Sequence, residues 1–566
     1  MNPAESAHPA HPESPARLSV IPLGGVEEIG GLNMTVIEYG NDMIVVDAGL
    51  MFPEEDMPGV DFVIPDITYL LENRDRLRGI ILTHGHEDHT GALPFVLKAL
   101  PVPVYGTPLT LALVQQKLRE YELEEEAELI PVRPRDVITL GSLTVEFIRV
   151  THSIVDGVAL GIKTPLGSII HTGDFKLDPT PVDGELMDFH TFSRYGEEGT
   201  LLMLSDSTNA GKGGFTFSEK EVRRAFEDIF AKKHGRIIIA TFASNIHRVQ
   251  QVIDVAVQFG RKVFMCGRSM LSNAQIALEL GYLNIPEKTW LTMDRLKEMP
   301  DNEVVILTTG SQGEPMSVLS RIATDEHKHI SIREGDTVIL SAKMIPGNER
   351  SIGRIINHLM MRGADVKYER TSEIHVSGHA SKEELKLMMN IVRPRYFVPI
   401  HGEYRHLSFH ARLAEKSAIP KENIFILGNG SVLELSENGP SLAGKVHAGR
   451  IFIDGKGAPS VEDIVLRDRR RLGHDGIVIV LVGIEKKTRQ MVIGPEIISR
   501  GFVFEDVSQD IINEVRDLMT QTIMSVEEDV IADISLLQAK LRSRLKKYLR
   551  DTMDRYPMIM PIILEV

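Results

Sequence analysis

Four side chains that can bind metal ions fall within six consecutive positions of the stretch ILTHGHEDHTGALP, namely His84, His86, Asp88 and His89. Imidazole and carboxylate groups are the usual protein ligands of zinc and similar ions. In an extended segment His84 and His86 point to the same side, whereas the adjacent Asp88 and His89 project in different directions. The stretch follows an apolar run, so we predict a loop at a strand end that supplies ligands to two neighbouring ions.

Three more candidate ligands follow other predicted strands. His152 follows residues 144–150, Asp174 follows residues 168–171, and His401 follows the apolar run YFVPI. Asp47 ends the strand in DMIVVDAG, where it fits two roles equally well: orienting a ligand histidine or capping a turn. A metal site at the shared rim of these strands would collect ligands that are far apart in the sequence.

The length, net charge and cysteine count of the chain limit the class of protein. A chain of 566 residues is too long for one core and predicts three or four domains. The formal net charge of −16 argues mildly against a general nucleic-acid coat, although bound cations and a local basic groove can outweigh it. The lone cysteine, Cys266, rules out an internal disulfide and fits a reducing cytoplasm.

No membrane segment is expected from the sequence. The longest apolar run, IVIVLVGI at 477–484, is far shorter than the ~20 residues that cross a bilayer. Residues 1–17 lack the charged start and apolar stretch of a signal peptide and predict a disordered tail. We therefore expect a cytoplasmic protein.

The first part of the chain is rich in short predicted strands bounded by Gly, Asn or Asp. Helical patterns interrupt them at 91–100 and 107–120, and TPLG at 164–167 predicts a hairpin turn. This pattern favours a sheet sandwich with helices outside. The predicted strands are 18–25, 33–40, 42–49, 78–85, 143–150, 158–164 and 167–174.

From residue 214 to 372 the pattern changes to repeated units of apolar strand, polar loop and amphipathic helix. The four units are 236–256, 262–280, 303–323 and 337–359. They predict a parallel sheet with helices on its faces, and such folds bind ligands at the carboxyl ends of the strands.

The last part of the chain predicts two further pieces. Residues 373–440 return to short strands and one helix, and the strands 477–484 and 491–497, the helical region 508–553 and MIMPIILEV at the end predict a small α+β domain. Five basic residues gather on its last helix, where we favour a solvated helix face over RNA contact. They are Arg542, Arg544, Lys546, Lys547 and Arg550.

The ligand pattern resembles that of a known superfamily. His84-x-His86-x-Asp88-His89, followed by His152, Asp174 and His401, is similar to the metallo-β-lactamase fold. Asp206 in LSDSTNA and His379 in HVSGHAS resemble the β-CASP nucleases within it. The motifs TFASNIHR, TTGSQGEP, PGNE and PIHGEYRH narrow the resemblance to ribonuclease J, over residues 17–566.

The resemblance implies the domain order and fold class: a metallo-β-lactamase αββα sandwich with an inserted parallel α/β β-CASP domain and a small C-terminal α+β domain. The sandwich would comprise residues 18–213 and 373–445, and the insert residues 214–372. A linker at 446–460 would lead to the C-terminal domain at 461–566.

The resemblance also implies a site with two divalent ions, Zn²⁺ being favoured and Mn²⁺ the alternative. One ion would be held by His84, His86, His152 and Asp174, and the other by Asp88, His89, Asp174 and His401, with Asp174 bridging. Asp88 and His379 would have catalytic roles, and Asp47 and Asp206 would orient neighbouring side chains. The substrate phosphates would contact Ser244, Asn245, His375, Ser377 and His379.

Such a site can hydrolyse phosphodiesters without a protein nucleophile. Two divalent ions ~3.5–4 Å apart activate water and stabilise both oxygens of an in-line displacement. His379 would contact the scissile phosphate or protonate the leaving group. For His247 and Arg248 we favour ordinary helix surface.

Three functions are compared. The resemblance implies a ribonuclease of single-stranded RNA, a 5′-to-3′ exonuclease preferring 5′-monophosphate ends with endonuclease activity, in messenger decay and ribosomal RNA maturation. It would assemble as a homodimer or homotetramer through its C-terminal domain and join the RNA-decay machinery. A DNA-directed β-CASP nuclease is the second, since a phosphodiester site does not itself sense the 2′-hydroxyl. A non-catalytic RNA-binding scaffold with a relic site is the third.

Overall fold

The computed structural model describes residues 17–54, 56–314, 316–343, 348–369, 374–455, 463–502, 508–527, 530–531 and 533–566. Residues 1–16 of the predicted tail, 346–347 of the PGNE motif and 456–460 of the predicted linker lie outside them. The chain forms two compact units. The first comprises residues up to 52 and 63–451, and the second comprises 53–62 and 452–566.

Two β-sheets face each other in the first unit. The eight-stranded sheet has the order β20 (Gly439–Lys445), β19 (Ser431–Ser436), β1 (Leu18–Gly24), β2 (Met34–Tyr39), β3 (Asp42–Val46), β5 (Leu77–Ile81), β6 (Val104–Gly106) and β7 (Leu129–Pro131). The six-stranded sheet has the order β18 (Tyr396–Ile400), β12 (Thr200–Asp206), β11 (Gly167–His171), β10 (Val158–Thr164), β9 (Leu143–Arg149) and β8 (Val137–Leu140).

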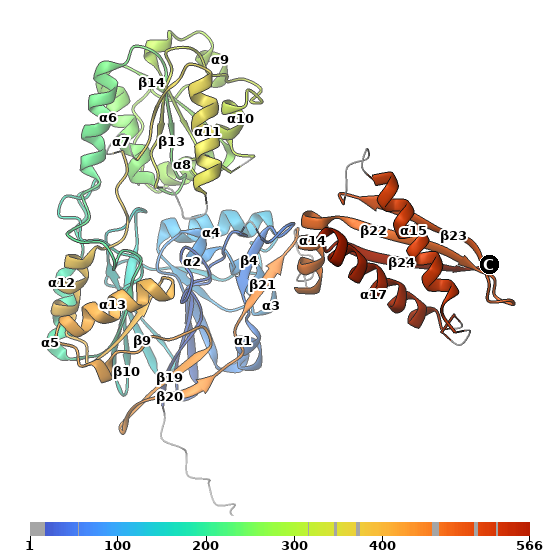
Figure 1. The fold of residues 1–566 in the computed structure, drawn as a ribbon. Coiled ribbons are helices and arrows are strands. Elements are labelled where there is room, and N and C mark those ends of the chain that lie inside the picture. The colour runs from blue at the N-terminus through green and yellow to red at the C-terminus, as the bar shows by residue number, and fades with distance from the viewer. Residues whose placement is uncertain are drawn as a thin grey trace, which may run out of the picture. The chain divides into compact units, whose positions relative to one another are not determined.

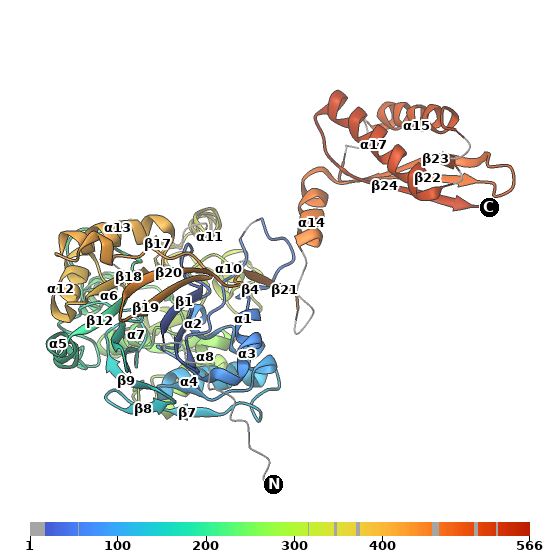
Figure 2. The same ribbon diagram turned by 90° about the horizontal axis from the view of Figure 1, so that it is seen from below.

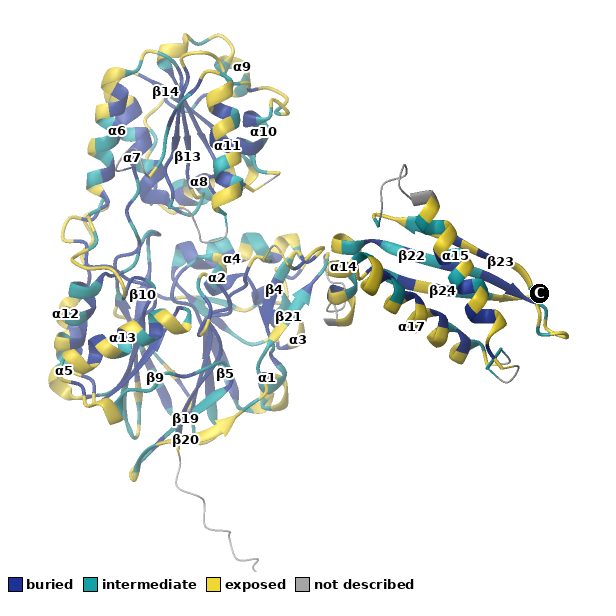
Figure 3. Ribbon diagram, viewed as in Figure 1, coloured by how far each residue is buried: buried dark blue, intermediate teal, exposed yellow. Residues whose placement is uncertain are grey.

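The core between these sheets is built by alternating apolar side chains. Val20 and Ile37 of the first sheet share one buried cluster with Phe147 and Leu160 of the second. Strands alternate their side chains between faces, so one face of each sheet fills this layer. Figure 3 shows the buried strands in dark blue inside the unit.

Helices cover the outer faces of the sandwich, as the αββα architecture requires. α5 (Phe189–Glu198), α12 (Lys382–Val392) and α13 (Tyr404–Lys416) pack on the outside of the six-stranded sheet, where Phe192, Met388 and Leu413 share a core with Phe397. Figure 2 shows α12 and α13 on this side. The other helices are α1 (Thr68–Glu72), η1 (Arg74–Arg76), α2 (Glu87–Thr90), α3 (Leu93–Ala99), α4 (Pro108–Glu120) and η3 (Lys421–Asn423).

The predicted strands and hairpin of this unit are confirmed, with two differences. Thr164 pairs with Gly167 across the turn between β10 and β11. Residues 373–440 hold two helices, α12 and α13, where one was expected. The strands β6, β7 and β8 were not predicted, because three or four residues are too few to display an alternating pattern, and the longer strands β12, β19 and β20 were missed as well.

The inserted segment forms a five-stranded, wholly parallel sheet. Its order is β14 (Lys262–Cys266), β15 (Val304–Thr308), β13 (Ile237–Ala240), β16 (Thr337–Leu340) and β17 (Asp365–Lys367). The four predicted strand–loop–helix units are confirmed. The carboxyl ends of β13, β15 and β16 therefore lie at one edge of the sheet.

Helices lie on both faces of this sheet (Figure 1). α6 (Lys220–Lys232), α7 (Ile246–Gln258) and α8 (Arg268–Glu279) pack on one face, where Phe226, Val249 and Met270 meet Ile239. α10 (Val318–Ala323) and α11 (Glu349–Met361) pack on the other. The short helices are α9 (Met293–Leu296) and η2 (Asp301–Glu303).

The second unit is a three-stranded sheet with helices on one face. The order is β23 (Met491–Arg500), β22 (Ile477–Ile484) and β24 (Met558–Glu565), and α15 (Ser508–Met524) and α17 (Ile534–Met553) lie together on one side (Figure 2). Leu541 and Leu545 of α17 pack against Val480 of β22. The predicted α+β composition is confirmed, and all five basic residues singled out on α17 are exposed.

Residues 53–62 belong to this second unit, a pairing that the predicted division did not include. Arg469 of α14 (Asp463–Asp475) donates to the carbonyl oxygen of Gly59 at 2.9 Å, and Arg470 pairs with Asp56 at 2.9 Å. The chain passes between the units after Phe52, within β4 (Phe62–Pro65) and within β21 (Arg450–Ile453). Among the described helices, none has both the length and the apolarity needed to span a bilayer.

Candidate metal centre

The carboxylate of Asp174 lies in the middle of the predicted ligands. Asp174 follows β11, and its Oδ2 atom is 3.8 Å from His84 Nε2 and 3.3 Å from His89 Nε2. The same oxygen is 3.8 Å from His152 Nε2 and 3.6 Å from His401 Nε2. The ends of β5, β9, β11 and β18 therefore meet at one carboxylate oxygen.

The predicted ligands fall into two sets whose donor atoms lie within 4.8 Å of one another. One set is His84, His86 and His152, and the other is Asp88, His89, Asp174 and His401. Asp174 Oδ2 also contacts two histidines of the first set, so it lies between the sets as a bridging ligand would. All seven residues predicted as ligands are brought together.

Asp47 and Thr83 contact two of the predicted ligands, His89 and His84. Asp47 Oδ2 is 2.8 Å from His89 Nδ1, and the Thr83 hydroxyl donates to the same oxygen at 2.9 Å. Thr83 Oγ1 is also 3.1 Å from His84 Nδ1. Asp47 has a φ of +63°, a left-handed conformation that non-glycine residues adopt rarely and mostly at constrained sites. Of the two roles considered for Asp47, its contacts favour orientation of a ligand histidine.

Asp206 and Thr208 contact two other histidines of the site, His379 and His401. Asp206, the last residue of β12, accepts from His379 Nδ1 through Oδ2 at 2.9 Å. Its Oδ1 atom accepts from the Thr208 hydroxyl at 2.8 Å, and Thr208 Oγ1 is 2.7 Å from His401 Nδ1. The ring of His379 stacks on that of His401 with centroids 5.4 Å apart. His379 and the predicted ligand His401 thus share one carboxylate.

Burial and charge divide the histidines into two classes. Burial lowers the pKa of His84, and it lowers the pKa of His86 to about 4 and that of His152 to about 3. Burial alone would also lower the pKa of His89 and His401, but the surrounding carboxylates, Asp174 first among them, together outweigh it and raise both. The first set is therefore neutral, the state in which imidazole binds metal.

The donor set fits divalent cations. Histidine rings of the cluster lie as close as 4.1 Å between centroids, and His84 Nε2 is 3.0 Å from His86 Nδ1. Nδ1 of His84, His89 and His401 has an oxygen partner, so the Nε2 lone pairs of these rings face the interior. Unprotonated nitrogens and carboxylates that converge in this way repel one another unless a proton or a metal cation lies between them.

The loop HVSGHAS lies against this cluster. The carbonyl oxygen of Gly378 accepts from His152 Nδ1 at 2.7 Å. A Cβ on Gly378 would lie 2.6 Å from His152 Cε1, so only glycine allows this close approach. Ser377 Oγ accepts from Asn209 Nδ2 at 2.8 Å and from the His379 amide at 3.3 Å. The loop is fixed relative to the ligands by these contacts.

Ser244, Asn245 and His375 lie apart from the ligands. Asn245 caps α7 by accepting from the Arg248 amide at 3.0 Å, and the Ser244 carbonyl accepts from the Ile246 amide at 2.9 Å. Burial, and next the guanidinium of Arg248, lower the pKa of His375 to about 3. Within the described ranges, none of the three makes a hydrogen bond or ion pair with the predicted ligands. Their phosphate contacts stay predictions.

The expectation of a surface position for His247 and Arg248 is wrong. Arg248 is fully buried, and its Nη2 pairs with Glu219 at 2.8 Å while Nη1 donates to Ile374 O at 3.0 Å. This guanidinium ties together the two segments by which the chain enters and leaves the inserted domain. A charged residue on an amphipathic helix is normally solvated, and the distant Glu219, Ser341 and Ile374 make burial favourable here.

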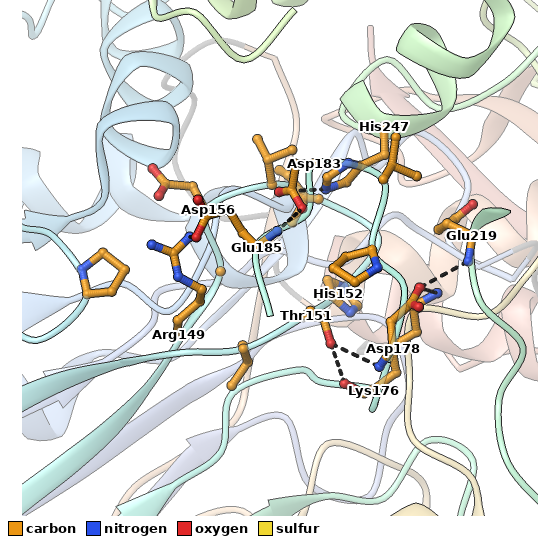
Figure 4. Close-up of a pocket in the computed structure, with 17 residues that line it drawn as sticks. Arg149, Thr151, His152, Asp156, Lys176, Asp178, Asp183, Glu185, Glu219 and His247 are labelled. Carbon is orange, nitrogen blue, oxygen red and sulfur yellow. Dashed lines mark hydrogen bonds and ion pairs between the residues drawn. The ribbon is translucent and has the colours of Figure 1, made fainter. Parts of the chain in front are cut away.

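A narrow pocket that is open to solvent lies beside His152, between the sandwich and the inserted domain (Figure 4). Its charged lining is paired: Lys176 with Asp178 at 3.4 Å, and Arg149 with Glu185 at 3.2 Å. Because these charges are matched within the protein, the pocket offers less to a phosphate than the loop on the other side of His152 does.

Sequence reasoning missed several residues that touch the ligands. Asn33 Nδ2 donates to the Asp88 carbonyl at 2.9 Å and lies 3.2 Å from His89 Nε2. Thr83 and Thr208, described above, were not singled out either. Thr208 lies in the quoted motif LSDSTNA, two positions after Asp206, which is the one signal that could have identified it.

Family models match nearly the whole chain. The metallo-β-lactamase superfamily model matches residues 29–240, and the ribonuclease J β-CASP domain model matches residues 234–359. A model described as the Zn-dependent metallo-hydrolase RNA specificity domain matches residues 363–427, and that of the ribonuclease J C-terminal domain matches residues 464–566.

A solved structure, that of a protein of unknown function from Enterococcus faecalis, is similar in fold with a TM-score of 0.53. It is 17% identical in sequence, and the matched region covers 74% of this chain and 100% of that chain.

Curated relatives match over almost their full length. Ribonuclease J 1 of Streptococcus pyogenes is 43% identical over 550 residues, which are 97% of this chain and 98% of that protein. Ribonuclease J of Thermus thermophilus is 43% identical over 557 residues, 97% of this chain and 95% of that protein. At this identity and coverage, the chain belongs to the ribonuclease J family and is a metal-dependent ribonuclease.

Proposed function

We propose that this ribonuclease degrades single-stranded RNA from its 5′ end, prefers a 5′-monophosphate, and also cuts internally. The observation that carries the proposal is the convergence of four histidine nitrogens on Asp174 Oδ2, beside a loop that presents His379 and Ser377. By resemblance the enzyme would act in messenger decay and ribosomal RNA maturation, with the RNA-decay machinery.

Two divalent cations would be held by the two ligand sets, with Asp174 shared. When bound, they supply Lewis acidity that lowers the pKa of water and stabilises the charge that develops on phosphate. The donor set of five histidines and two carboxylates favours Zn²⁺, and Mn²⁺ is the alternative. Asp88, with 22% of its side chain exposed, is one of the two predicted ligands that are not fully buried, and it is assigned to orient the attacking water.

His379 is assigned as the proton donor to the leaving ribose oxygen. Asp206 accepts from Nδ1 at 2.9 Å, which fixes the orientation of the ring and leaves Nε2 on its far edge. Among the described residues Nε2 has no hydrogen-bond partner, and a fifth of the side chain is exposed. This nitrogen is therefore available to a substrate, as a general acid must be.

Ser377 is assigned to bind a substrate phosphate. Its Oγ accepts two hydrogen bonds, from Asn209 Nδ2 and from the His379 amide. A hydroxyl whose lone pairs are occupied in this way has its own proton left to donate. That proton is suited to a phosphate oxygen, and at an exonuclease site the phosphate would be that of the 5′ end.

The open face of the C-terminal sheet supports assembly into a homodimer or homotetramer. Ile498 and Met560 both pair with Ile479 across this sheet and are 40% and 42% exposed. Leu564, on the same face, is 47% exposed. α15 and α17 cover the opposite face, so this apolar surface is suited to a second copy of the chain. A cytoplasmic location is proposed on the single cysteine alone.

Matched RNAs with a 5′-monophosphate, a 5′-triphosphate or a circular backbone test the proposal, with DNA of the same sequence beside them. We expect mononucleotides from the monophosphorylated RNA, slower release from the triphosphate, and only internal cuts in the circle. Intact monophosphorylated RNA in the presence of Zn²⁺ or Mn²⁺ would refute the proposal. Equal hydrolysis of DNA would support the alternative of a DNA-directed nuclease.

A further inference from the structure

The Thr208 hydroxyl lies between a carboxylate and a ligand histidine. Its Oγ1 atom is 2.8 Å from Asp206 Oδ1 and 2.7 Å from His401 Nδ1. Asp206 Oδ1 itself is 3.5 Å from His401 Nδ1, too far for a good hydrogen bond. Thr208 therefore fills the gap between the two groups.

The direction of each hydrogen bond follows from the single hydroxyl proton. The Thr208 proton can go to Asp206 Oδ1 at 2.8 Å or to the His401 carbonyl at 3.4 Å, and the shorter contact is to a charged acceptor. Oγ1 then has lone pairs left to accept from His401 Nδ1. This arrangement requires the proton of a neutral His401 ring to be on Nδ1, which leaves the Nε2 lone pair facing Asp88 and Asp174.

The same arrangement occurs a second time in the cluster. Thr83 Oγ1 lies 2.9 Å from Asp47 Oδ2 and 3.1 Å from His84 Nδ1. Thr83 is fully buried and its backbone amide also donates to Asp47, as the amide of Thr208 does to Asp206. Two threonines of the cluster thus each connect a carboxylate to a ligand histidine by the same set of bonds.

The backbone of His401 needs such support. Its φ is +56°, a left-handed conformation that a non-glycine residue keeps only where its surroundings hold it. The strand β18 ends at Ile400, so His401 is the first residue beyond the sheet. Without a partner at Nδ1, the ring can turn about its side-chain bonds.

We propose that Thr208 is a positioning residue that fixes the tautomer and the orientation of His401, so that Nε2 is presented to the second cation. The proposal rests on the metal-binding function proposed above. Thr208 also couples that ligand to His379, because the two oxygens of Asp206 serve the two histidines separately. Ligand geometry and the proton donor are thereby set by one carboxylate.

Two substitutions separate the hydroxyl from the shape of the side chain. Thr208→Val keeps the shape and removes the hydroxyl, whereas Thr208→Ser keeps the hydroxyl. Zn²⁺ affinity is measured by competition with a chelator, which distinguishes a tightly bound ion from a weakly bound one. The melting temperature of each metal-free variant is measured as well. We expect Thr208→Val to weaken one of the two ions by about 10- to 100-fold and Thr208→Ser by less than about threefold.

Thr180→Val is the matched control, since Thr180 donates to Ser218 at 2.9 Å outside the cluster. The proposal is overturned if Thr208→Val binds both ions as the wild type does, or if Thr208→Ser is as weak as Thr208→Val. If the two metal-free variants melt at the same temperature, the difference in Zn²⁺ affinity between them arises from the hydroxyl and not from a change in stability. A wild-type chain that binds no Zn²⁺ would instead refute the proposed metal-binding function itself.

Discussion

Asp174 Oδ2 lies 3.6 Å from His401 Nε2, although the whole inserted domain separates the two residues in the sequence. β11 and β18 both run parallel to β12, so their carboxyl ends meet at the same edge of the six-stranded sheet. The contact is therefore a direct result of sheet topology, and the other ligands gather around it.

Replacement of Asp174 by Asn should affect both cations, because one oxygen serves both ligand sets. We expect bound metal, measured by elemental analysis, to fall from two ions per chain to one or none. RNA hydrolysis should fall by about 100-fold or more. Asp254→Asn, at a half-exposed site on α7, should leave both unchanged. Full metal content in the Asp174 variant would contradict the bridging role.

Replacement of His379 by Ala should slow the cleavage of RNA by about 10²- to 10⁴-fold while bound metal stays constant. A p-nitrophenyl ester of a nucleotide should lose far less, because p-nitrophenolate leaves without a proton. The ratio of the two effects measures the proton donation by His379. An equal loss on both substrates would exclude it.

Acid should weaken the link between Glu219 and Arg248. Burial alone would raise the pKa of Glu219, but the cations of Arg248 and Lys176 outweigh it and lower the value to about 2. The folded state therefore binds fewer protons than the unfolded state, whose value is near 4.5. The stabilisation is complete above about pH 4.5 and is lost as the pH falls towards 2.

Glu219→Gln tests this at two pH values. The variant should lose about 3 kcal/mol of unfolding free energy at pH 7, because Arg248 is left buried without its partner, and less at pH 3. Trp290, the single tryptophan, packs on the core of the inserted domain and reports its unfolding in urea by fluorescence. Glu221→Gln removes an exposed pair with Arg224 nearby and should have little effect. A pH-independent difference would be inconsistent with this account.

Gly378→Ala should displace the ring of His152, since the new methyl group would lie 2.6 Å from its Cε1 atom. We expect about tenfold weaker binding of the cation held by His84, His86 and His152, measured by chelator competition. Gly353→Ala on α11, where a methyl group meets no atom within 4 Å, is the control. Unchanged affinity would show that the loop can move without cost.

Charges on the open face of the C-terminal sheet should dissociate an oligomer. Ile498→Lys combined with Met560→Lys places two cations on this apolar surface. Light scattering after gel filtration should then give the mass of one chain. Lys546→Glu, on the exposed side of α17, should leave the oligomer intact. If the wild type is itself a monomer, the proposed assembly is wrong.

Much of the site could be predicted because its ligands follow apolar strands directly. His84, His152, Asp174 and His401 each come within three residues of a strand end, where a short pattern in the sequence is sufficient. The chemistry of histidine and aspartate then leaves few alternatives. Strands longer than four residues were predicted where their side chains alternate or are uniformly apolar. The exceptions are β12 and the strands β19 and β20 of the last hairpin of the sandwich.

What could not be predicted depends on pairs that are distant in the sequence. The burial of Arg248 requires Glu219, and the position of residues 53–62 requires Arg469 and Arg470. The role of Thr208 depends on a 2.7 Å contact with His401. Polar residues are common on surfaces, so no local pattern distinguishes these from solvated ones.

The order of the ligands along the chain has a consequence for biosynthesis. During translation the N-terminal histidine motif emerges first, but His401 follows only after the inserted domain has been made. A nascent or prematurely terminated chain that ends before this residue lacks a ligand of one cation and the central strand-end contact with Asp174. Hydrolysis of RNA at this site therefore requires that translation has passed residue 401 of the 566.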